Sequence, residues 1–399
     1  MAGLYTTGFK ETDIDVGLKY VEKSYLMDFY ADLIGHAISP ALLLWGNNGN
    51  SQLGDNTIVT KSSPIQTIQG GANWKQVACG NSFTGAIKTD GTLWMWGRNS
   101  QGFLGDGTTI NRLSPVQTIQ GGTNWKQLAC GNSLTGAIKT DGTLWMWGFG
   151  TQGQLGDNTQ VDKWSPVQTI QGGTNWKQLA CGMFSAAAVK TDGTLWMWGQ
   201  NGYGQIGDNT IVAKSSPVQT IVGGTNWKQV ACGESHTVAV KTDGTLWSWG
   251  RNFWGELGDN TVIAKSSPVQ TIQGGVNWKQ VACGDRHTAA IKTDGTLWLW
   301  GNNINGQLGD NTTANKWSPV QTIQGGNNWK QVACGGYHST SIKIDCTLWV
   351  WGNNSNGRLG DNTIVNKSSP IQTIIGGGNW KQVSGGADFT SAIKEGEDF

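Results

Sequence analysis

Three histidines recur at a fixed interval, and by residue type they could form a metal site. His236, His287 and His338 are each 51 residues apart, and three imidazoles are an established ligand set for zinc. The same position in the other copies of the pattern holds apolar or small residues: Phe83, Leu134, Ser185 and Phe389. A position that accepts phenylalanine and leucine in the same chain is typical of packing, so we predict no metal site.

Cysteine follows the same interval and could supply redox or metal chemistry. Six of the seven cysteines occupy one position in successive copies of the pattern: Cys79, Cys130, Cys181, Cys232, Cys283 and Cys334. Symmetry places each in a different unit near a central axis, where a small side chain suits buried packing better than a disulfide. Cys346 is different, because it replaces the glycine of a recurring Asp-Gly turn. A side chain there is expected to cost about 1 kcal/mol through left-handed backbone strain.

No set of residues suited to catalysis stands apart from the repeated pattern. The glycine-rich stretches of the type IQGGTNWK lack the Gly-Lys-Ser/Thr ending of a phosphate-binding loop. The recurring carboxylates, of which Asp55 and Asp90 are examples, are interpreted as turn formers that accept local backbone hydrogen bonds. We therefore predict a protein that is not an enzyme and that binds no cofactor.

Composition indicates what kind of scaffold holds these residues. The chain has 399 residues, of which 60 are glycine and 23 are tryptophan, and only 14% are charged. Abundant glycine disfavours helices, while low charge with many aromatic residues disfavours disorder. The net charge of +1 provides no bulk attraction to nucleic acid or to an anionic membrane. No apolar run approaches the length of a membrane-spanning helix, and no secretory signal is recognisable. The sequence predicts an all-β, turn-rich protein.

A repeat of 51 residues determines the predicted architecture. Trp-Gly pairs begin at seven positions with this spacing: Trp45, Trp96, Trp147, Trp198, Trp249, Trp300 and Trp351. Each unit contains four predicted strands, which in one copy are Trp74–Cys79, Phe83–Lys88, Leu93–Trp96 and Val116–Ile119. The second and third strands are joined by a tight hairpin at Asp90-Gly91, whose central residues need positive φ. Four short strands in each of seven units predict a seven-bladed β-propeller, with a β-solenoid as the structural alternative.

The two ends of the repeat are complementary half-units. The last copy ends after the strand Phe389–Lys394, and the first begins with the third-strand segment Leu42–Trp45 and a fourth strand over residues 65–68. A blade that takes two strands from each end would pair the free sheet edges and close the ring. We therefore predict a propeller over residues 41–399, preceded by a separate N-terminal segment over residues 1–40.

Several motifs of the repeat are similar to those of the RCC1-repeat family. They are WGNNINGQLGD at 300–310, VACGESHT at 230–237 and DGTLWSWG at 243–250. The resemblance covers residues 41–399 and implies a seven-bladed propeller with a closing clasp. Members of the family include exchange factors for a small GTPase, an ultraviolet photoreceptor, β-lactamase inhibitor proteins and ubiquitin-ligase modules.

Two activities of that family are not expected in this chain. The segment Gly284–Thr288 has aspartate where the photoreceptor members have tryptophan. The constant spacing of 51 residues leaves no room for the inserted wedge that exchange factors project against the GTPase. The resemblance therefore predicts the fold more closely than it predicts a function.

The loops that vary among the units predict a binding face. If the four strands run alternately up and down, the loops between the first and second strands share one face of the disc with the loops between the third and fourth. These loops differ from unit to unit, and loop tips on a rigid scaffold are where recognition residues concentrate. The predicted binding residues are Phe103, Phe149, Phe184, Tyr203, Phe253, Trp254, Arg286 and Tyr337. Neutral drift at the loop tips is the alternative interpretation.

Residues 1–40 differ in composition from the repeats, with four of the six tyrosines and no tryptophan. A helix start at Thr12 and apolar residues at approximate helical spacing predict a partly helical segment that packs against another surface. The predicted anchor residues are Tyr20, Tyr25, Phe29 and Tyr30. The stretch TDIDVGLKYVEKSYLMDFY resembles RCC1-like proteins of tailed bacteriophages.

Two functional hypotheses follow. The first is a non-enzymatic structural protein of a virion, for display, decoration or adhesion on a tail or capsid. It would be anchored through residues 1–40, with virion proteins or a host-surface receptor as partners. The second is a soluble cytoplasmic module that binds or inhibits one protein partner. Neither hypothesis includes a nucleic-acid partner or insertion into a membrane, and residues 1–40 could also pack on their own propeller.

Overall fold

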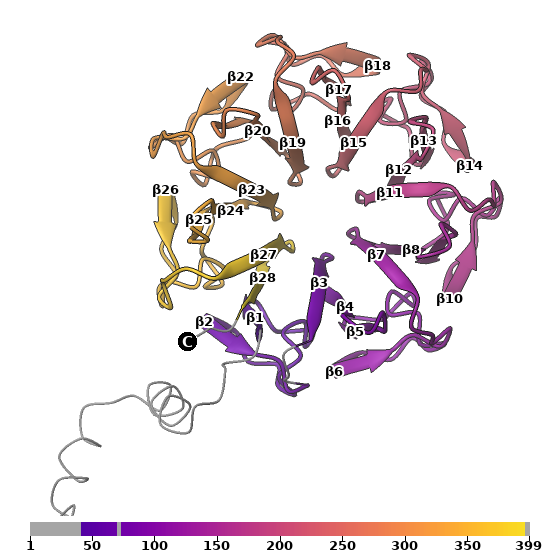
Figure 1. Ribbon diagram of the computed structural model, residues 1–399, viewed down its shortest axis with the longest axis horizontal. Coiled ribbons are helices and arrows are strands. Elements are labelled where there is room, and N and C mark those ends of the chain that lie inside the picture. Colours follow the sequence, from indigo (N-terminus) through magenta and orange to yellow (C-terminus); the bar gives the residue numbers. More distant parts are fainter. Residues whose placement is uncertain (1–40, 70–72, 396–399) are drawn as a thin grey trace, which may run out of the picture. The chain divides into compact units, whose positions relative to one another are not determined.

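The computed structural model describes residues 41–69 and 73–395. Within these ranges every regular element is a β-strand, and the strands form seven four-stranded sheets around a central axis (Figure 1). The predicted all-β, seven-bladed propeller is therefore confirmed, and a solenoid is excluded. The predicted N-terminal helix and the anchor residues Tyr20, Tyr25, Phe29 and Tyr30 lie outside the described residues.

Each blade contains an inner, a second, a third and an outer strand, in that order from the axis. Blade 1 consists of β3 (Trp74–Cys79), β4 (Phe83–Lys88), β5 (Leu93–Gly97) and β6 (Arg112–Gln117). Blade 2 consists of β7 (Trp125–Cys130), β8 (Leu134–Lys139), β9 (Leu144–Gly148) and β10 (Lys163–Gln168). Blade 3 consists of β11 (Trp176–Cys181), β12 (Ser185–Lys190), β13 (Leu195–Gly199) and β14 (Lys214–Gln219). Blade 4 consists of β15 (Trp227–Cys232), β16 (His236–Lys241), β17 (Leu246–Gly250) and β18 (Lys265–Gln270).

The remaining blades follow the same pattern. Blade 5 consists of β19 (Trp278–Cys283), β20 (His287–Lys292), β21 (Leu297–Gly301) and β22 (Lys316–Gln321). Blade 6 consists of β23 (Trp329–Cys334), β24 (His338–Lys343), β25 (Leu348–Gly352) and β26 (Lys367–Gln372). Blade 7 combines β27 (Trp380–Gly385) and β28 (Phe389–Lys394) with β1 (Ala41–Gly46) and β2 (Lys61–Gln66).

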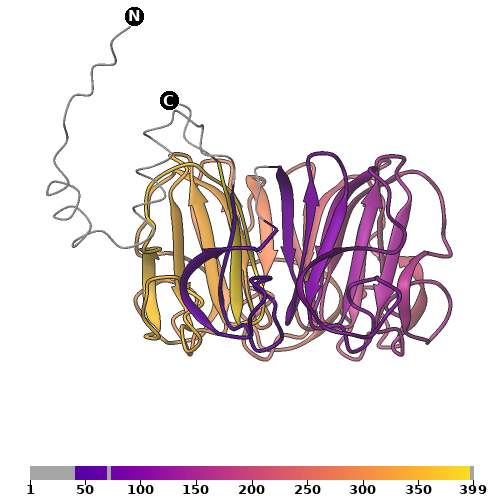
Figure 2. The ribbon, with the colours of Figure 1, turned by 90° about the horizontal axis from the view of Figure 1, so that it is seen from below.

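The strands cross the propeller from one face to the other, so the connections fall into two sets (Figure 2). The inner-to-second and third-to-outer connections lie on one face, which we name the loop face. The second-to-third connections and the links between blades lie on the other, which we name the turn face. All strand pairs within a blade are antiparallel, as in the pairing of Thr84 with Trp96.

The outer strands begin earlier than the sequence suggested. In blade 1 the outer strand is Arg112–Gln117 rather than Val116–Ile119, and in blade 7 it is Lys61–Gln66 rather than residues 65–68. A bulge between Met95 and Gly97 brings Gly97 opposite Arg112, so pairing starts before Pro115. Proline is tolerated inside this strand because an outer edge does not need every ladder donor.

The hairpin on the turn face also differs from the expectation. Gly91 has a positive φ of 81°, but Asp90 does not, so only one central residue is left-handed. Gly91 N donates to the carbonyl oxygen of Lys88, and Lys88 N donates to that of Thr92, each at 3.0 Å. This is a three-residue loop with a glycine bulge, whereas the two-residue type I′ turn that Asp-Gly pairs favour needs both central residues at positive φ. The carboxylate of Asp90 accepts hydrogen bonds from the backbone and hydroxyl of Thr92, which confirms its role as a turn former.

The closing clasp lies in blade 7. Strands β1 and β28 pair over six residues, from Ala41 opposite Lys394 to Gly46 opposite Phe389. The sheet order β2-β1-β28-β27 joins both ends of the repeat in one blade, as Figure 1 shows. The predicted two-plus-two closure is confirmed.

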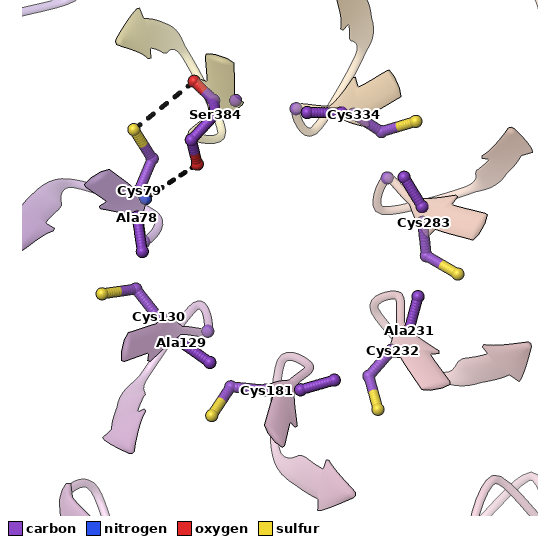
Figure 3. Close-up of a pocket in the computed structure, with 18 of the residues that line it drawn as sticks. Ala78, Cys79, Ala129, Cys130, Cys181, Ala231, Cys232, Cys283, Cys334 and Ser384 are labelled. Atoms are coloured by element: carbon purple, nitrogen blue, oxygen red, sulfur yellow. Dashed lines mark hydrogen bonds between the residues drawn. The ribbon is translucent and has the colours of Figure 1, made fainter. Parts of the chain in front are cut away.

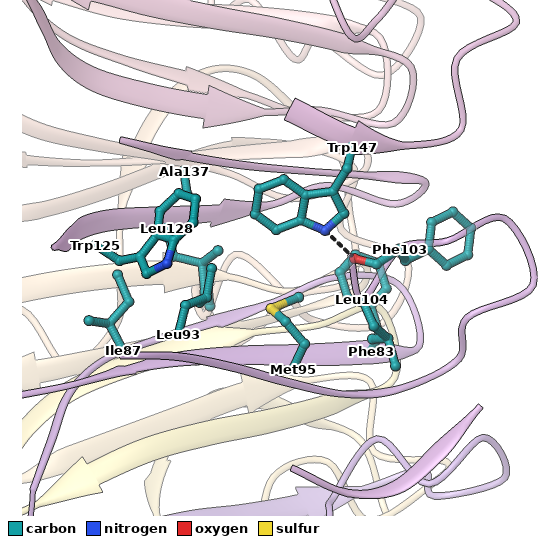
Figure 4. Close-up of a cluster of buried hydrophobic side chains, with 11 residues drawn as sticks. Phe83, Ile87, Leu93, Met95, Phe103, Leu104, Trp125, Leu128, Ala137 and Trp147 are labelled. Atoms are coloured by element: carbon teal, nitrogen blue, oxygen red, sulfur yellow. Dashed lines mark hydrogen bonds between the residues drawn. The ribbon is translucent and has the colours of Figure 1, made fainter. Parts of the chain in front are cut away.

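The hydrophobic core lies between adjacent blades, as a ring of separate clusters. In the cluster of Figure 4, Met95 of blade 1 faces Trp147 of blade 2, and both side chains are fully buried. The indole nitrogen of Trp147 donates a 2.8 Å hydrogen bond to the carbonyl oxygen of Phe103 in blade 1. Equivalent indole bonds cross every blade junction, with donors Trp45, Trp96, Trp147, Trp198, Trp249, Trp300 and Trp351. The tryptophan of each Trp-Gly pair therefore connects two adjacent blades through a hydrogen bond.

Glutamine side chains join the inner strands. Gln76 of β3 donates to the carbonyl oxygen of Leu128 at 2.9 Å and accepts from its backbone nitrogen at 3.0 Å. Gln382 of β27 makes the same pair of bonds with Val77, which completes the ring at the junction of blades 7 and 1. The inner strands of adjacent blades do not pair with each other directly. The side-chain amide of each such glutamine instead forms hydrogen bonds with the backbone of the next inner strand.

Candidate binding face

The aromatic residues predicted for binding lie on the loop face, but they are unequal in exposure. Tyr203 and Phe253, from the third-to-outer loops of blades 3 and 4, are 39% and 56% exposed. Their rings meet edge to face, with centroids 5.5 Å apart. Trp254 beside them is half-buried, and its backbone nitrogen donates to the Glu256 carboxylate at 2.8 Å. These three residues form an accessible aromatic patch on a fixed backbone.

Phe149 and Phe184 form a second aromatic pair between blades 2 and 3. Their ring centroids are 5.7 Å apart, and both side chains are half-buried. Phe103 does not belong to the accessible surface, because only 3% of it is exposed. It stacks on Phe83 with a centroid distance of 5.3 Å and fills the junction of blades 1 and 2. The prediction that Phe103 is a binding residue is therefore contradicted by its burial.

Arg251 is the centre of a charged cluster on blades 4 and 5 that the sequence did not predict. Its guanidinium, 7% exposed, contacts the carboxylates of Glu234 and Glu256 at 2.8 and 3.0 Å. It also donates to the carbonyl oxygen of Asp285 in the next blade at 3.0 Å. Arg286, a predicted binding residue, contacts the same Glu234 carboxylate at 3.2 Å. These contacts lock the loops of two blades together.

Burial and charge alter the acidity of this cluster. Burial raises the pKa of Glu256 above its ordinary value, and the contact with Arg251 opposes that rise. Burial also raises the pKa of Asp285 to about 6, and the nearby carboxylate of Glu234 adds to the effect. Tyr337, the last predicted binding residue, is half-buried next to the cluster, and burial followed by the charge of Asp285 raises its pKa.

Arg358 forms a second ion pair that joins blades 6 and 7. Its side chain is 2% exposed and contacts the Asp388 carboxylate at 2.8 Å. The same guanidinium donates to the carbonyl oxygen of Ala387 and to the hydroxyl of Ser355. The loop face is therefore aromatic over blades 2 to 4 and charged over blades 4 to 7.

The three equally spaced histidines are buried and do not converge on a metal. Nε2 of His236 lies 3.1 Å from the hydroxyl of Thr288, and Nε2 of His338 lies 2.8 Å from that of Thr390. Burial lowers the pKa of His236 and of His287 to about 3, so both are neutral at pH 7. Within residues 41–69 and 73–395, no group of three or more His, Cys, Asp or Glu residues is arranged to hold a metal ion.

The six repeated cysteines lie on the inner strands, around the central channel. Figure 3 shows that their sulfur atoms point toward neighbouring blades and do not gather on the axis. All seven cysteines are free of disulfides, and burial raises the pKa of the Cys79 thiol to about 12. Cys79 Sγ lies 2.9 Å from the hydroxyl of Ser391. The expected packing role therefore agrees with their positions.

No helix in the part of the chain that the structure describes has the length and apolar character needed to cross a membrane.

The repeat matches established family models along most of its length. Residues 38–325 match the RCC1-like domain, and residues 329–358 and 346–393 match the regulator of chromosome condensation (RCC1) repeat. The chain is 34% identical to the ultraviolet-B receptor UVR8 of Arabidopsis thaliana over 66% of its own length and 61% of the receptor's. It is 28% identical to the human E3 ubiquitin-protein ligase HERC2 over 85% of its own length, but it spans only 7% of that protein.

Solved structures agree with the fold. Human WBSCR16 superposes with a TM-score of 0.78 at 22% identity, over 89% of this chain and 99% of that one. Prp20p of Saccharomyces cerevisiae gives 0.78 at 19% identity, over 91% and 93%. Seven blades of this repeat, closed by a two-plus-two clasp and matched by the family models, place the chain in the RCC1-like domain family.

Proposed function

We propose that this propeller is a non-enzymatic module that binds a protein partner through its loop face. The observation that carries the proposal is the aromatic patch of Tyr203, Phe253 and Trp254 beside the charged cluster around Arg251. Aromatic residues and arginine are enriched among the residues that dominate binding at protein interfaces. The ion pairs also fix the loops before binding, which lowers the entropic cost of association.

Related propellers that are known to bind proteins support a protein as the ligand. Yeast RCC1 (Prp20) has been solved with Kap60 bound, and Prp20p has binding properties toward Gsp1p and histones. Because these structures are about one fifth identical to the chain, they support a protein as ligand without identifying which protein. The partner of this chain is to be found by experiment.

Site-specific photo-crosslinking tests the proposal. A crosslinking amino acid at Phe253 should yield a discrete protein adduct in the native host, and the adduct can be identified by mass spectrometry. The matched control is Ile272, which lies on the turn face of the same blade and is 57% exposed, against 56% for Phe253. Purified partner should then bind at least about thirtyfold more weakly to Phe253→Ala with Tyr203→Ala, and equally well to Ile272→Ala. Adducts at Ile272 but not at Phe253 would overturn the choice of face.

We further propose that residues 1–40 attach the propeller to a larger assembly, for which a virion is the specific candidate. The composition of residues 1–40 and their resemblance to phage-encoded chains support this hypothesis. Deletion of residues 1–40 should leave the melting temperature unchanged and abolish co-sedimentation with particles. Retention of co-sedimentation would contradict the anchor, and loss of folding would show that residues 1–40 belong to the core.

A further inference from the structure

The inner strands enclose a central channel of about 290 Å³. Its walls consist of strand residues without charge and of glycines at the loop-face mouth, among them Gly80, Gly131 and Gly182. The labelled alanine and cysteine side chains in Figure 3 leave opposite faces of the inner strands, so the strand edges themselves border the space. Backbone groups, side-chain amides and small side chains therefore surround the channel. Among the residues that line it, Asp285 is the one carboxylate.

Asp285 has an equivalent residue in every blade, and those of blades 2, 6 and 7 also line the channel. The equivalent residues are Asn81, Asn132, Met183, Glu234, Gly336 and Ala387. Gly336 in the neighbouring blade leaves space for the carboxylate, because a Cβ at Gly336 would lie 2.9 Å from Asp285 Oδ2. Asn132, three blades away around the ring, lines the same mouth, and its side chain is near enough to lower the pKa of Asp285. The carboxylate therefore lies over the channel opening.

The side chain of Asp285 has no ion-pair partner among the described residues, although two arginines lie nearby. The cluster contains three carboxylates, on Glu234, Glu256 and Asp285, and two guanidinium groups, on Arg251 and Arg286. Both guanidiniums contact Glu234, and Arg251 also contacts Glu256, whereas the side chain of Asp285 forms no ion pair among the described residues. One negative charge is left over, and it lies on the residue that faces the channel.

We propose that the channel mouth binds an aliphatic primary ammonium group, with Asp285 as its counter-ion. A primary ammonium is a compact charge with three N–H donors, and it can use the Asp285 carboxylate together with neutral oxygens such as the amide of Asn132. Its unbranched stem fits beside the small side chains that line the channel. Ca²⁺ takes about six to eight oxygen ligands, and the lining supplies a single carboxylate toward that number. The ammonium group can belong to a free small amine or to a lysine side chain of a partner.

Proton binding at Asp285 opposes ammonium binding. Burial raises the pKa of Asp285 to about 6, Glu234 raises it further, and Asn132, Arg286 and Arg251 lower it. Tyr337, also adjacent, has a raised pKa and is neutral in this range. Because the ligand requires the ionised carboxylate, affinity should be full above pH 7 and should fall as the pH drops through about 6.

Calorimetric titration of the full chain with n-butylamine tests the site. We expect binding of n-butylamine at pH 7.5, no binding of n-butanol, and an affinity at least about tenfold lower for Asp285→Asn. The matched control is Asp294→Asn, which removes a carboxylate from the turn face of the same blade and should leave binding unchanged. Equal binding of n-butanol, or full affinity in Asp285→Asn, would overturn the proposal.

A second ligand distinguishes the two sources of the ammonium group. Nα-acetyl-lysine amide should bind with the same dependence on Asp285 if a partner lysine can enter the mouth, which supports the proposal and identifies the source. Binding of n-butylamine alone supports a free amine as the ligand. Binding of neither ligand overturns the proposal but leaves the photo-crosslinking test of the loop face unaffected.

Discussion

The indole nitrogen of Trp45 donates a hydrogen bond of 2.8 Å to the carbonyl oxygen of Arg358, 313 residues away in the sequence. The same carbonyl oxygen accepts a second bond from the hydroxyl of Thr390 at 2.8 Å. Double donation of this kind occurs at most blade junctions. At the junction of blades 2 and 3, Ala186 stands where the hydroxyl residue would be, and the carbonyl oxygen of Gln154 accepts only from Trp198 among the described side chains.

This difference predicts unequal effects of one substitution at two equivalent sites. Trp198→Phe leaves the buried carbonyl oxygen of Gln154 without its indole donor and should cost about 1–3 kcal/mol of unfolding free energy. Trp45→Phe leaves the Thr390 bond in place and should cost about 1 kcal/mol less. Urea unfolding of both variants measures the difference, and equal destabilisation would contradict it.

A second prediction concerns the strained turn of blade 6. Cys346 has a positive φ of 61°, where the other copies of the turn have glycine, as at Gly295. Cys346→Gly should raise the unfolding free energy by about 1 kcal/mol, less the entropy that glycine adds to the unfolded chain. Thermal unfolding measures the change. The reverse substitution Gly295→Cys serves as control and should destabilise strongly, because its Cβ would clash with the carbonyl oxygen of Asn327.

The link after blade 6 shows how Cys346 is accommodated. Gly378 replaces the bulkier residue found in other links, and Asn379 has a positive φ of 71° that its counterparts do not share. We expect Gly378→Thr to be more destabilising in the natural chain than in the Cys346→Gly variant. A double-mutant cycle with additive energies would show that the two positions are independent.

The buried histidines predict a loss of stability in mild acid. The pKa of His236 is about 3 in the folded state, against an ordinary value of 6.5. Below pH 6.5 the unfolded chain binds a proton that the folded chain does not, so each such histidine lowers stability by about 1.4 kcal/mol per pH unit. His236→Phe should therefore reduce the stability difference between pH 7.5 and pH 5.5 by about that amount.

A control separates titration from the loss of a contact. Thr288→Val removes the hydroxyl that His236 contacts but keeps the imidazole, and it should leave the pH dependence unchanged. Urea midpoints at the two pH values provide the measurement. The prediction is wrong if His236→Phe retains the full pH dependence of the natural chain.

Ser384 differs from its equivalents in the other blades, and this difference allows a test of one hydrogen bond in the channel wall. Its hydroxyl accepts a 3.1 Å hydrogen bond from the backbone nitrogen of Cys79, and alanine occupies the equivalent position in the other six blades. Ser384→Ala should cost about 1 kcal/mol. The reciprocal change Ala231→Ser should be neutral or stabilising, since it offers the same acceptor to Cys283. Calorimetric melting of both variants measures these changes. An unchanged stability of Ser384→Ala would contradict the interpretation.

Much of the fold follows from the sequence because one pattern is repeated without insertion. The interval of Trp45 and its counterparts predicted the blade number, and the half-units at the two ends predicted the clasp. The start of the outer strands was not predicted, because it depends on a bulge at Gly97 that has no distinct sequence signal. Phe103 was misplaced for a similar reason, since its burial depends on stacking against Phe83, which only the packed structure shows.

The charged cluster had a signal that could have been found by comparing the repeats. In blade 5, Gln307 donates to the side-chain oxygen of Asn302 at 2.6 Å. In blade 4 the same two positions hold Glu256 and Arg251, which form an ion pair instead. Two neutral partners that change together to opposite charges indicate contact within one loop. The bond from Arg251 to the next blade could not be inferred, because it depends on how two loops converge in space.

The clasp has a consequence for synthesis of the chain on the ribosome. Strand β1 is translated first, but its partner β28 begins about 340 residues after β1 ends. At about 5–20 residues per second, β1 waits roughly 17–70 s for that partner. During this interval the apolar edge that carries Leu42 and Leu44 has only β2 beside it. The nascent propeller therefore has an unpaired strand edge until β28 is made. We expect this edge to be a site of aggregation and of chaperone binding before blade 7 closes.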